Sequence, residues 1–213
     1  MSYRTWLFDL DGTLLDSVAL ILSSYRHTLT VHRGTPPADD VWLAGLGTPL
    51  WEQFRVFTED RAEIDAMIAT YREHNLAHHD AMVREYPGVR DAVGTIRANG
   101  RLGVVTSKTH TGAERGLRTL DMADWFEVLI GADDVTRTKP DPEPVLVAMD
   151  RLDADPGSTV FVGDSPHDMA SGRAAGVATA AVLWGPFRRD HLAPHDPTHW
   201  LTVPGDLTRI MPA

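Results

Sequence analysis

The sequence contains no cysteine, and this absence already excludes several kinds of site. Without cysteine the chain forms no disulfide, binds no metal through thiolates and uses no cysteine nucleophile. Positive charge is also scarce, because 20 basic residues against 30 acidic ones give a formal charge of −10. A protein that binds nucleic acid irrespective of sequence needs a basic face, so we expect no nucleic-acid partner.

Long hydrophobic runs are missing as well, and none could span a bilayer. The apolar stretch near the N-terminus is interrupted by Asp9 and Asp11, so it does not have the pattern of a signal peptide. We therefore expect a soluble, cytoplasmic protein that does not bind membranes.

The first part of the chain is a short apolar segment followed by helical periodicity. Residues 6–8 predict a buried strand that ends at a glycine-containing loop. From 16 to 85 we find no convincing strand. Apolar residues with helical spacing are Val18, Ile21, Leu22, Tyr25 and Leu29, then Ile64, Met67, Ile68 and Tyr71. A shorter helix is predicted over 48–57, and Trp42, Trp51 and Phe54 are expected in the core of this bundle.

The pattern changes after residue 86, where strands and helices alternate. Strands are predicted over 102–106, 128–130, 159–162 and 177–183, with an edge strand over 200–203. Helices are predicted over 89–99, 112–120, 142–152 and 166–175. Such alternation is typical of a parallel sheet covered on both faces. The sequence thus predicts an α/β protein: a Rossmann-like parallel sheet core (1–15 and 86–213) interrupted by an inserted all-helical cap domain (16–85).

Polar residues that could do chemistry follow the predicted strands. In open α/β sheets, ligands bind beyond the carboxyl ends of the strands, so these residues should gather at one edge. They are Asp9 and Asp11 after the first strand, Thr106, Ser107 and Lys108 after the second, the segment 133–139, and Asp164 and Asp168 after the strand ending at Val162. Lys108 and Lys139 are also the only lysines in the chain. A compact ammonium kept at these two places suits a small phosphate pocket.

Four segments in this order resemble the haloacid dehalogenase-like superfamily, in its magnesium-dependent phosphatase branch. They are Phe8-Asp9-Leu10-Asp11-Gly12-Thr13-Leu14, Val104-Val105-Thr106-Ser107-Lys108, Lys139-Pro140 and Gly163-Asp164-Ser165-Pro166-His167-Asp168. Each segment alone is a weak signal, whereas all four in order are specific. The layout is similar to that of phosphoglycolate phosphatase and its relatives, and the inserted helices resemble that family's helical cap.

The resemblance implies a role for each residue. Asp9 would be the nucleophile that forms an aspartyl-phosphate, and an aspartate with its ordinary pKa of ~3.9 needs no activating base. Asp11 would protonate the leaving oxygen and then deprotonate water. Thr106, with Ser107 and Lys108, would bind the phosphoryl group, and Lys139 would neutralise the nucleophile and the phosphate.

The resemblance also implies a magnesium ion, held by Asp9, the backbone carbonyl of Asp11, and Asp164, with Asp168 in the outer shell. Charge supports this cofactor, because the four acids total −4 when ionised and a phosphate dianion adds about −2. Lys139 alone cannot offset that sum.

We therefore expect a magnesium-dependent phosphatase that hydrolyses small phosphomonoesters, with a small phosphorylated metabolite as its partner. A sugar phosphomutase and a pyrophosphatase of the same fold remain alternatives, as does a catalytically idle phosphate-binding module. A 2-haloacid dehalogenase is disfavoured because it does not require the acid Asp11. The substrate and the oligomeric state do not follow from the sequence.

Two features of the insertion are open to more than one interpretation. Residues 45–49 could be a substrate loop presented to the core or a simple connection between helices. Arg55 could offer its charge to a substrate carboxylate. His78 and His79 adjoin on a helix and so do not share a face, which disfavours a zinc site there.

Overall fold

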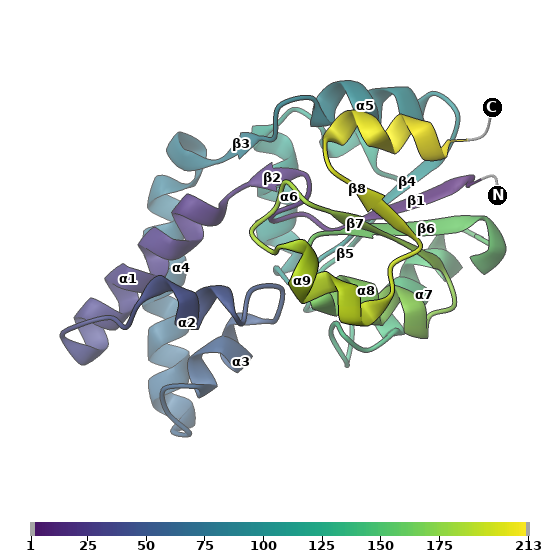
Figure 1. Ribbon diagram of the computed structural model, residues 1–213. Coiled ribbons are helices and arrows are strands. Elements are labelled where there is room, and N and C mark those ends of the chain that lie inside the picture. Colours follow the sequence, from purple (N-terminus) through teal and green to yellow (C-terminus); the bar gives the residue numbers. More distant parts are fainter. Residues whose placement is uncertain (1–2, 212–213) are drawn as a thin grey trace.

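The computed structural model describes residues 3–211, and a parallel six-stranded sheet lies at their centre (Figure 1). The strand order is β5-β4-β1-β6-β7-β8, and each strand runs parallel to its neighbours. The strands are β1 (Thr5–Phe8), β4 (Arg101–Val105), β5 (Val128–Ile130), β6 (Thr159–Gly163), β7 (Ala178–Val182) and β8 (His199–Leu201). The predicted α/β class is confirmed, and the last strand lies at the edge as expected.

Helices cover both faces of this sheet, so its central strands are apolar on both sides. All four residues of β1 are buried, as expected for a strand packed on two faces. Figure 1 shows α5 and η4 above the sheet and α7 and α8 below it. The elements are α5 (Val89–Arg97), α6 (His110–Thr119), η1 (Ala123–Trp125), α7 (Glu143–Arg151), η2 (Pro156–Ser158), α8 (Pro166–Ala174), α9 (Arg189–Leu192), η3 (Ala193–His195) and η4 (Pro204–Ile210).

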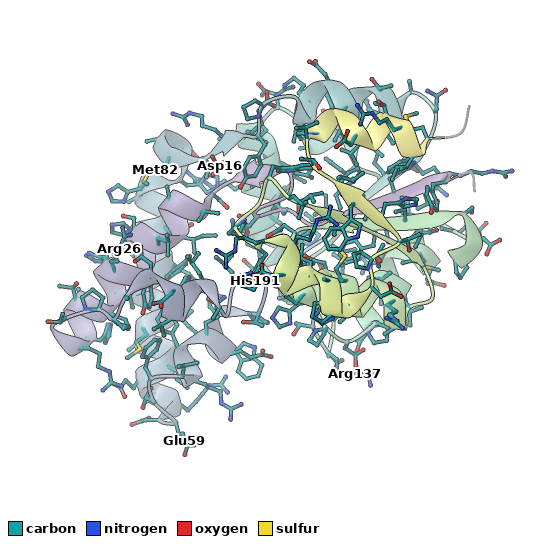
Figure 2. All side chains as sticks on the ribbon, viewed as in Figure 1. Asp16, Arg26, Glu59, Met82, Arg137 and His191 are labelled. Carbon is teal, nitrogen blue, oxygen red and sulfur yellow. The ribbon has the colours of Figure 1, made fainter. Side chains whose placement is uncertain are left out.

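Four helices between β1 and α5 form a separate mass beside the sheet, which we call the helical insertion. They are α1 (Val18–Arg33), α2 (Asp39–Leu43), α3 (Leu50–Arg55) and α4 (Arg61–Met82). The long helices α1 and α4 pack against each other. Figure 2 shows Asp16 and Met82 where the insertion joins the sheet-containing part, and Glu59 at its far end.

A two-stranded antiparallel ribbon connects the insertion to the rest of the chain. Strand β2 (Leu15–Asp16) pairs with β3 (Arg84–Glu85), so both chain crossings lie side by side. The expectation of no strand between 16 and 85 is therefore wrong at its two borders. Segments of two residues are too short to show an alternating pattern, which is why the sequence did not indicate them.

The core of the insertion is aromatic and continues into the sheet-containing part. Trp42 and Phe54 are buried as predicted, and their cluster extends to Met169 and Phe187. Trp51, in contrast, is 43% exposed, so its assignment to the core is wrong. It is not part of the aromatic cluster, and its ring packs beside Arg55. Among the helices of residues 3–211, none is both long and apolar enough to cross a membrane.

Candidate active site

The ends of three adjacent strands bring the predicted residues together. Asp9, Thr106 and Asp164 directly follow β1, β4 and β6, and β1 lies between the other two. The sheet's hydrogen bonding extends past β1, because the backbone N–H of Asp9 donates to the carbonyl of Val162 (2.9 Å). The side chain of Asp9 is thereby held at a fixed position on the carboxyl edge, where ligands bind in this class of sheet.

Asp9, Asp164 and Asp168 form a buried cluster of carboxylates at this edge. One oxygen from each lies within 4.8 Å of the others, and all three residues are at most 4% exposed. Lys139, only 1% exposed, donates to Asp9 Oδ1 (2.7 Å) and to Asp168 Oδ1 (2.6 Å). One buried cation thus pairs with two of the three buried acids.

Burial and mutual repulsion make this cluster electrostatically unusual. Burial, aided by the nearby charge of Asp168, raises the pKa of Asp9 to about 7 despite the ion pair with Lys139. Burial and the charges of Asp9 and Asp168 likewise raise the pKa of Asp164 well above its ordinary value. Burial alone would lower the pKa of Lys139, but its two carboxylate partners outweigh that effect and raise it. The expected ordinary pKa of Asp9 is therefore wrong for this arrangement, because the sequence shows neither burial nor neighbours.

Asp168 has a structural task as well as a place in the site. Its Oδ2 accepts hydrogen bonds from the backbone N–H and hydroxyl of Ser165, while Ser165 Oγ accepts from the backbone N–H of Asp168. This reciprocal capping box begins α8. The remaining oxygen of Asp168 contacts Lys139. One carboxylate therefore fixes the start of a helix and the position of the buried lysine.

Asp164 is positioned by the loop after β1. The hydroxyl of Thr13 donates to Asp164 Oδ1 (3.0 Å). Gly12 has a φ of +90° in this turn, and a Cβ there would lie 2.6 Å from Asp164 Oδ2. Only glycine allows the backbone to approach the carboxylate this closely.

Asp11 lies apart from the cluster and has its own partners. Its Oδ1 accepts from Lys108 Nζ (2.7 Å) and from Ser17 Oγ (2.6 Å). Burial alone would raise the pKa of Asp11, but Lys108 and Ser17 outweigh that effect and lower it. In this arrangement Asp11 is ionised, and Lys108 is committed to it.

A cavity of about 280 Å³ lies between the strand ends and the insertion. From the sheet side it is lined by Asp9, Asp11, Thr106, Ser107 and Lys108, and from the insertion by Gly47, Thr48, Gln53, Tyr71, Arg72 and Asn75, among others. The 45–49 loop lies against the sheet-containing part of the chain, on the side where we expected a substrate loop. Ser107 Oγ donates to the carbonyl of Gly47 (2.5 Å), which brings the insertion into contact with the carboxyl edge of the sheet.

The structure therefore brings the predicted residues that follow the strands to one edge, and it also shows what positions them. Ser17 donates to Asp11 and Thr13 donates to Asp164; Thr13 belongs to the first of the four family-like segments, whereas the sequence did not single out Ser17. Arg72 lines the cavity, whereas Arg55, the arginine favoured from the sequence, lies over the ring of Trp51. The sequence offers no signal that distinguishes these two arginines.

The carboxylate cluster fits a hard divalent cation. Three oxygen donors converge within 4.8 Å, and the raised pKa values of Asp9 and Asp164 show that one lysine does not neutralise them. A dication would remove this imbalance, and carboxylate oxygens are the ligands that magnesium prefers.

Comparison with known proteins gives a consistent result. A family model described as haloacid dehalogenase-like hydrolase matches residues 6–182. The pyrophosphatase PpaX of Anoxybacillus flavithermus is 41% identical over 99% of this chain and 98% of its own length. A Bacteroides fragilis protein classed with the haloacid dehalogenase-like hydrolases superimposes with a TM-score of 0.91 at 30% identity, covering 97% of this chain and 100% of that one. A Lactobacillus plantarum protein assigned as a phosphoglycolate phosphatase has a TM-score of 0.88 at 27% identity, covering 98% and 99%.

Proposed function

Because this chain belongs to the haloacid dehalogenase-like hydrolase family, we propose that it is a magnesium-dependent phosphatase of small phosphate compounds. The observation that carries the proposal is the buried group of Asp9, Asp164, Asp168 and Lys139, of which Asp9 lines a small cavity. A phosphate group placed there would meet a carboxylate nucleophile and cationic groups that stabilise its charge. This is the arrangement that phosphoryl transfer requires.

Asp9 is proposed as the nucleophile of a two-step reaction. Its carboxylate attacks phosphorus, the bond to the leaving oxygen breaks, and an aspartyl-phosphate forms; water then releases inorganic phosphate. Lys139 holds Asp9 in place through its 2.7 Å contact and offsets charge as the phosphoryl group arrives. Thr106 lines the same cavity, where its hydroxyl can donate to a phosphoryl oxygen.

Asp11 is proposed as the acid and base of the two steps. To act as the acid it must hold a proton, yet Lys108 and Ser17 stabilise its charged form. A phosphate that binds Lys108 competes for this lysine and frees Asp11 to take up a proton. After the leaving group departs, the ionised form of Asp11 is the one needed to deprotonate water.

Asp9, Asp164 and the backbone carbonyl of Asp11 would hold the magnesium ion, with Asp168 acting from outside through Lys139 and Ser165. A bound magnesium ion would neutralise the carboxylates and the phosphate oxygens. Removing divalent ions with a chelator should stop turnover of p-nitrophenyl phosphate, and magnesium, but not zinc, should restore it. Full activity in excess chelator would contradict the proposal.

Metal binding can also be tested without turnover. A ligand present at 100 times its dissociation constant stabilises a protein by about 2.7 kcal/mol, which raises the melting temperature of a chain this long by roughly 5 to 11 °C. Magnesium should produce such a shift in the wild type and lose it in Asp164→Asn. Asp206→Asn, which removes a buried carboxylate outside the cluster, should keep it. An equal shift in the Asp164 variant would remove that residue from the metal site.

We further propose that residues 16–85 form a cap and that 1–15 and 86–213 form the catalytic core. The β2–β3 ribbon is the narrow connection between them, and the Ser107–Gly47 hydrogen bond joins them across the cavity. A cap in this position would exclude bulk water from the reaction and contact the leaving group.

Pyrophosphate hydrolysis is the second candidate, and the 41% identity to a pyrophosphatase favours it. The two candidates share the same phosphoryl-transfer steps and differ only in the leaving group. Rates with pyrophosphate, phosphoglycolate, sugar phosphates and nucleotides, measured side by side with magnesium, would rank them. A catalytically idle module would turn over none of these compounds.

A further inference from the structure

One face of α4 forms the wall of the cavity opposite the carboxyl edge of the sheet, which carries Asp9, Thr106 and Asp164 and is called the catalytic edge from here on. Ile68, Tyr71, Arg72 and Asn75 all line the cavity, and their spacing of i, i+3, i+4 and i+7 places them along one stripe of the helix. Ile68 and Tyr71 make this wall largely apolar. Asn75 is already engaged, because its side-chain N–H donates to Ser24 Oγ (3.3 Å).

Arg72 is the charged residue of this stripe, and its guanidinium is uncommitted. Within residues 3–211, no ion pair or hydrogen bond joins its side chain to another residue. Other arginines of the insertion do have acidic partners: Arg26 with Asp39, Arg33 with Glu63, and Arg61 with Asp65. Arg72 therefore brings a free positive charge to a cavity wall.

The acids that line the cavity do not contact Arg72, and each has another partner. Asp9 contacts Lys139, Asp11 contacts Lys108, and Asp133 accepts from the backbone N–H of His110 (2.6 Å). The insertion contributes no acidic residue to the described lining. A group that enters from the catalytic edge toward α4 thus meets one unpaired guanidinium.

We infer that Arg72 binds the leaving group of the substrate and that this leaving group carries an anionic group, either a phosphate or a carboxylate. The inference rests on the proposed phosphatase function and specifies the part of the substrate that the catalytic edge does not contact. The planar fork of arginine matches both anions and can donate two hydrogen bonds to either. At about 280 Å³ the cavity suits a small compound rather than a large one.

The experiment compares substrates that share the transferred phosphate and differ in the leaving group. Steady-state kinetics with magnesium are measured for pyrophosphate, phosphoglycolate and phenyl phosphate, on the wild type, Arg72→Met, Arg72→Lys and Arg61→Met. Arg61 is the matched control, because it lies on the same helix, is exposed and is outside the cavity lining. Pyrophosphate, whose leaving group is phosphate, and phosphoglycolate, whose leaving group carries a carboxylate, distinguish the two anions.

Arg72→Met should lower kcat/KM about tenfold or more for at least one anionic leaving group, which is the loss expected for a charge-assisted hydrogen bond. The value for phenyl phosphate should change less than about threefold, Arg72→Lys should restore part of the loss, and Arg61→Met should behave as wild type. An equal loss on all three substrates, or no loss on any, would overturn the inference while leaving phosphatase function intact. A wild-type protein that hydrolyses no phosphate compound would instead overturn the proposed function.

Discussion

The two walls of the cavity differ in how firmly their charged groups are held. At the catalytic edge, Lys139 is almost completely buried and contacts two acids at 2.6 and 2.7 Å. On the opposite wall, Arg72 is exposed and has no partner among residues 3–211. A buried charge held by two fixed partners is suited to repeating one reaction, whereas a free charge is suited to choosing a ligand. This difference is what we expect if, as proposed, the strand ends carry the chemistry and the insertion selects the substrate.

The largest effect is expected when the proposed nucleophile at the strand ends is removed. Asp9→Asn keeps the size of the side chain and an oxygen that can accept from Lys139, so the fold should persist. Without a carboxylate no aspartyl-phosphate forms, and activity should fall below about 1% of wild type on every substrate. Turnover is measured with p-nitrophenyl phosphate, and mass spectrometry checks that the asparagine has not deamidated. Substantial activity in verified Asp9→Asn protein would contradict the covalent mechanism.

Substituting the two lysines separately tests which of them stabilises the charge of the reacting groups. Lys139→Met should cost more than Lys108→Met, because Lys139 joins Asp9 to Asp168 in a buried site, whereas Lys108 is partly exposed and contacts only Asp11. Losing a preorganised charge of this kind costs ~3 kcal/mol, or roughly a hundredfold in rate. Rates are expressed per folded molecule, and Lys139→Arg keeps the charge in case the methionine variant folds poorly. Equal effects, or the reverse order, would mean that the two lysines have been assigned the wrong roles.

The contact between the walls can be weakened at Gly47. This residue has a φ of +94°, and a Cβ there would lie 2.9 Å from Ser165 Oγ, so alanine should push the loop away from the core. Displacing a substrate loop by about 1 Å can cost up to a hundredfold, and we expect a loss of ten- to a hundredfold in kcat/KM. Gly34→Ala is the control, since it has a similar φ of +81° but no atom within 4 Å. Equal losses in both variants would show that backbone strain, and not the loop contact, is responsible.

The two walls of the cavity also differ in how much of each could be predicted from the sequence. Asp9, Thr106 and Asp164 were predictable because each directly follows a strand, and parallel strands end at one edge. The raised pKa of Asp9 was not, because it depends on burial and on Asp168, which is 159 positions away in the chain.

The insertion was predictable as helices but not as a cavity wall. Helical spacing correctly indicated α1 and α4, yet the same pattern cannot show which stripe of α4 faces the strand ends. The sequence therefore suggested Arg55 for substrate binding, did not single out Arg72, and placed Trp51 in the core. Which arginine enters the cavity depends on how the insertion is oriented by the β2–β3 ribbon, whose two-residue strands left no signal.

The most direct test of the central claim is to capture the phosphoryl group on the catalytic edge. Asp11→Asn removes the proposed base, so p-nitrophenyl phosphate, whose leaving group departs nearly unaided, should phosphorylate the enzyme faster than water can release it. Rapid quenching in acid followed by peptide mass spectrometry should then find one phosphoryl group on Asp9, with an amount approaching one per active site. If the Asp11→Asn enzyme still turns over while no phosphoryl group is found on Asp9, the assignment of the chemistry to the strand ends is wrong.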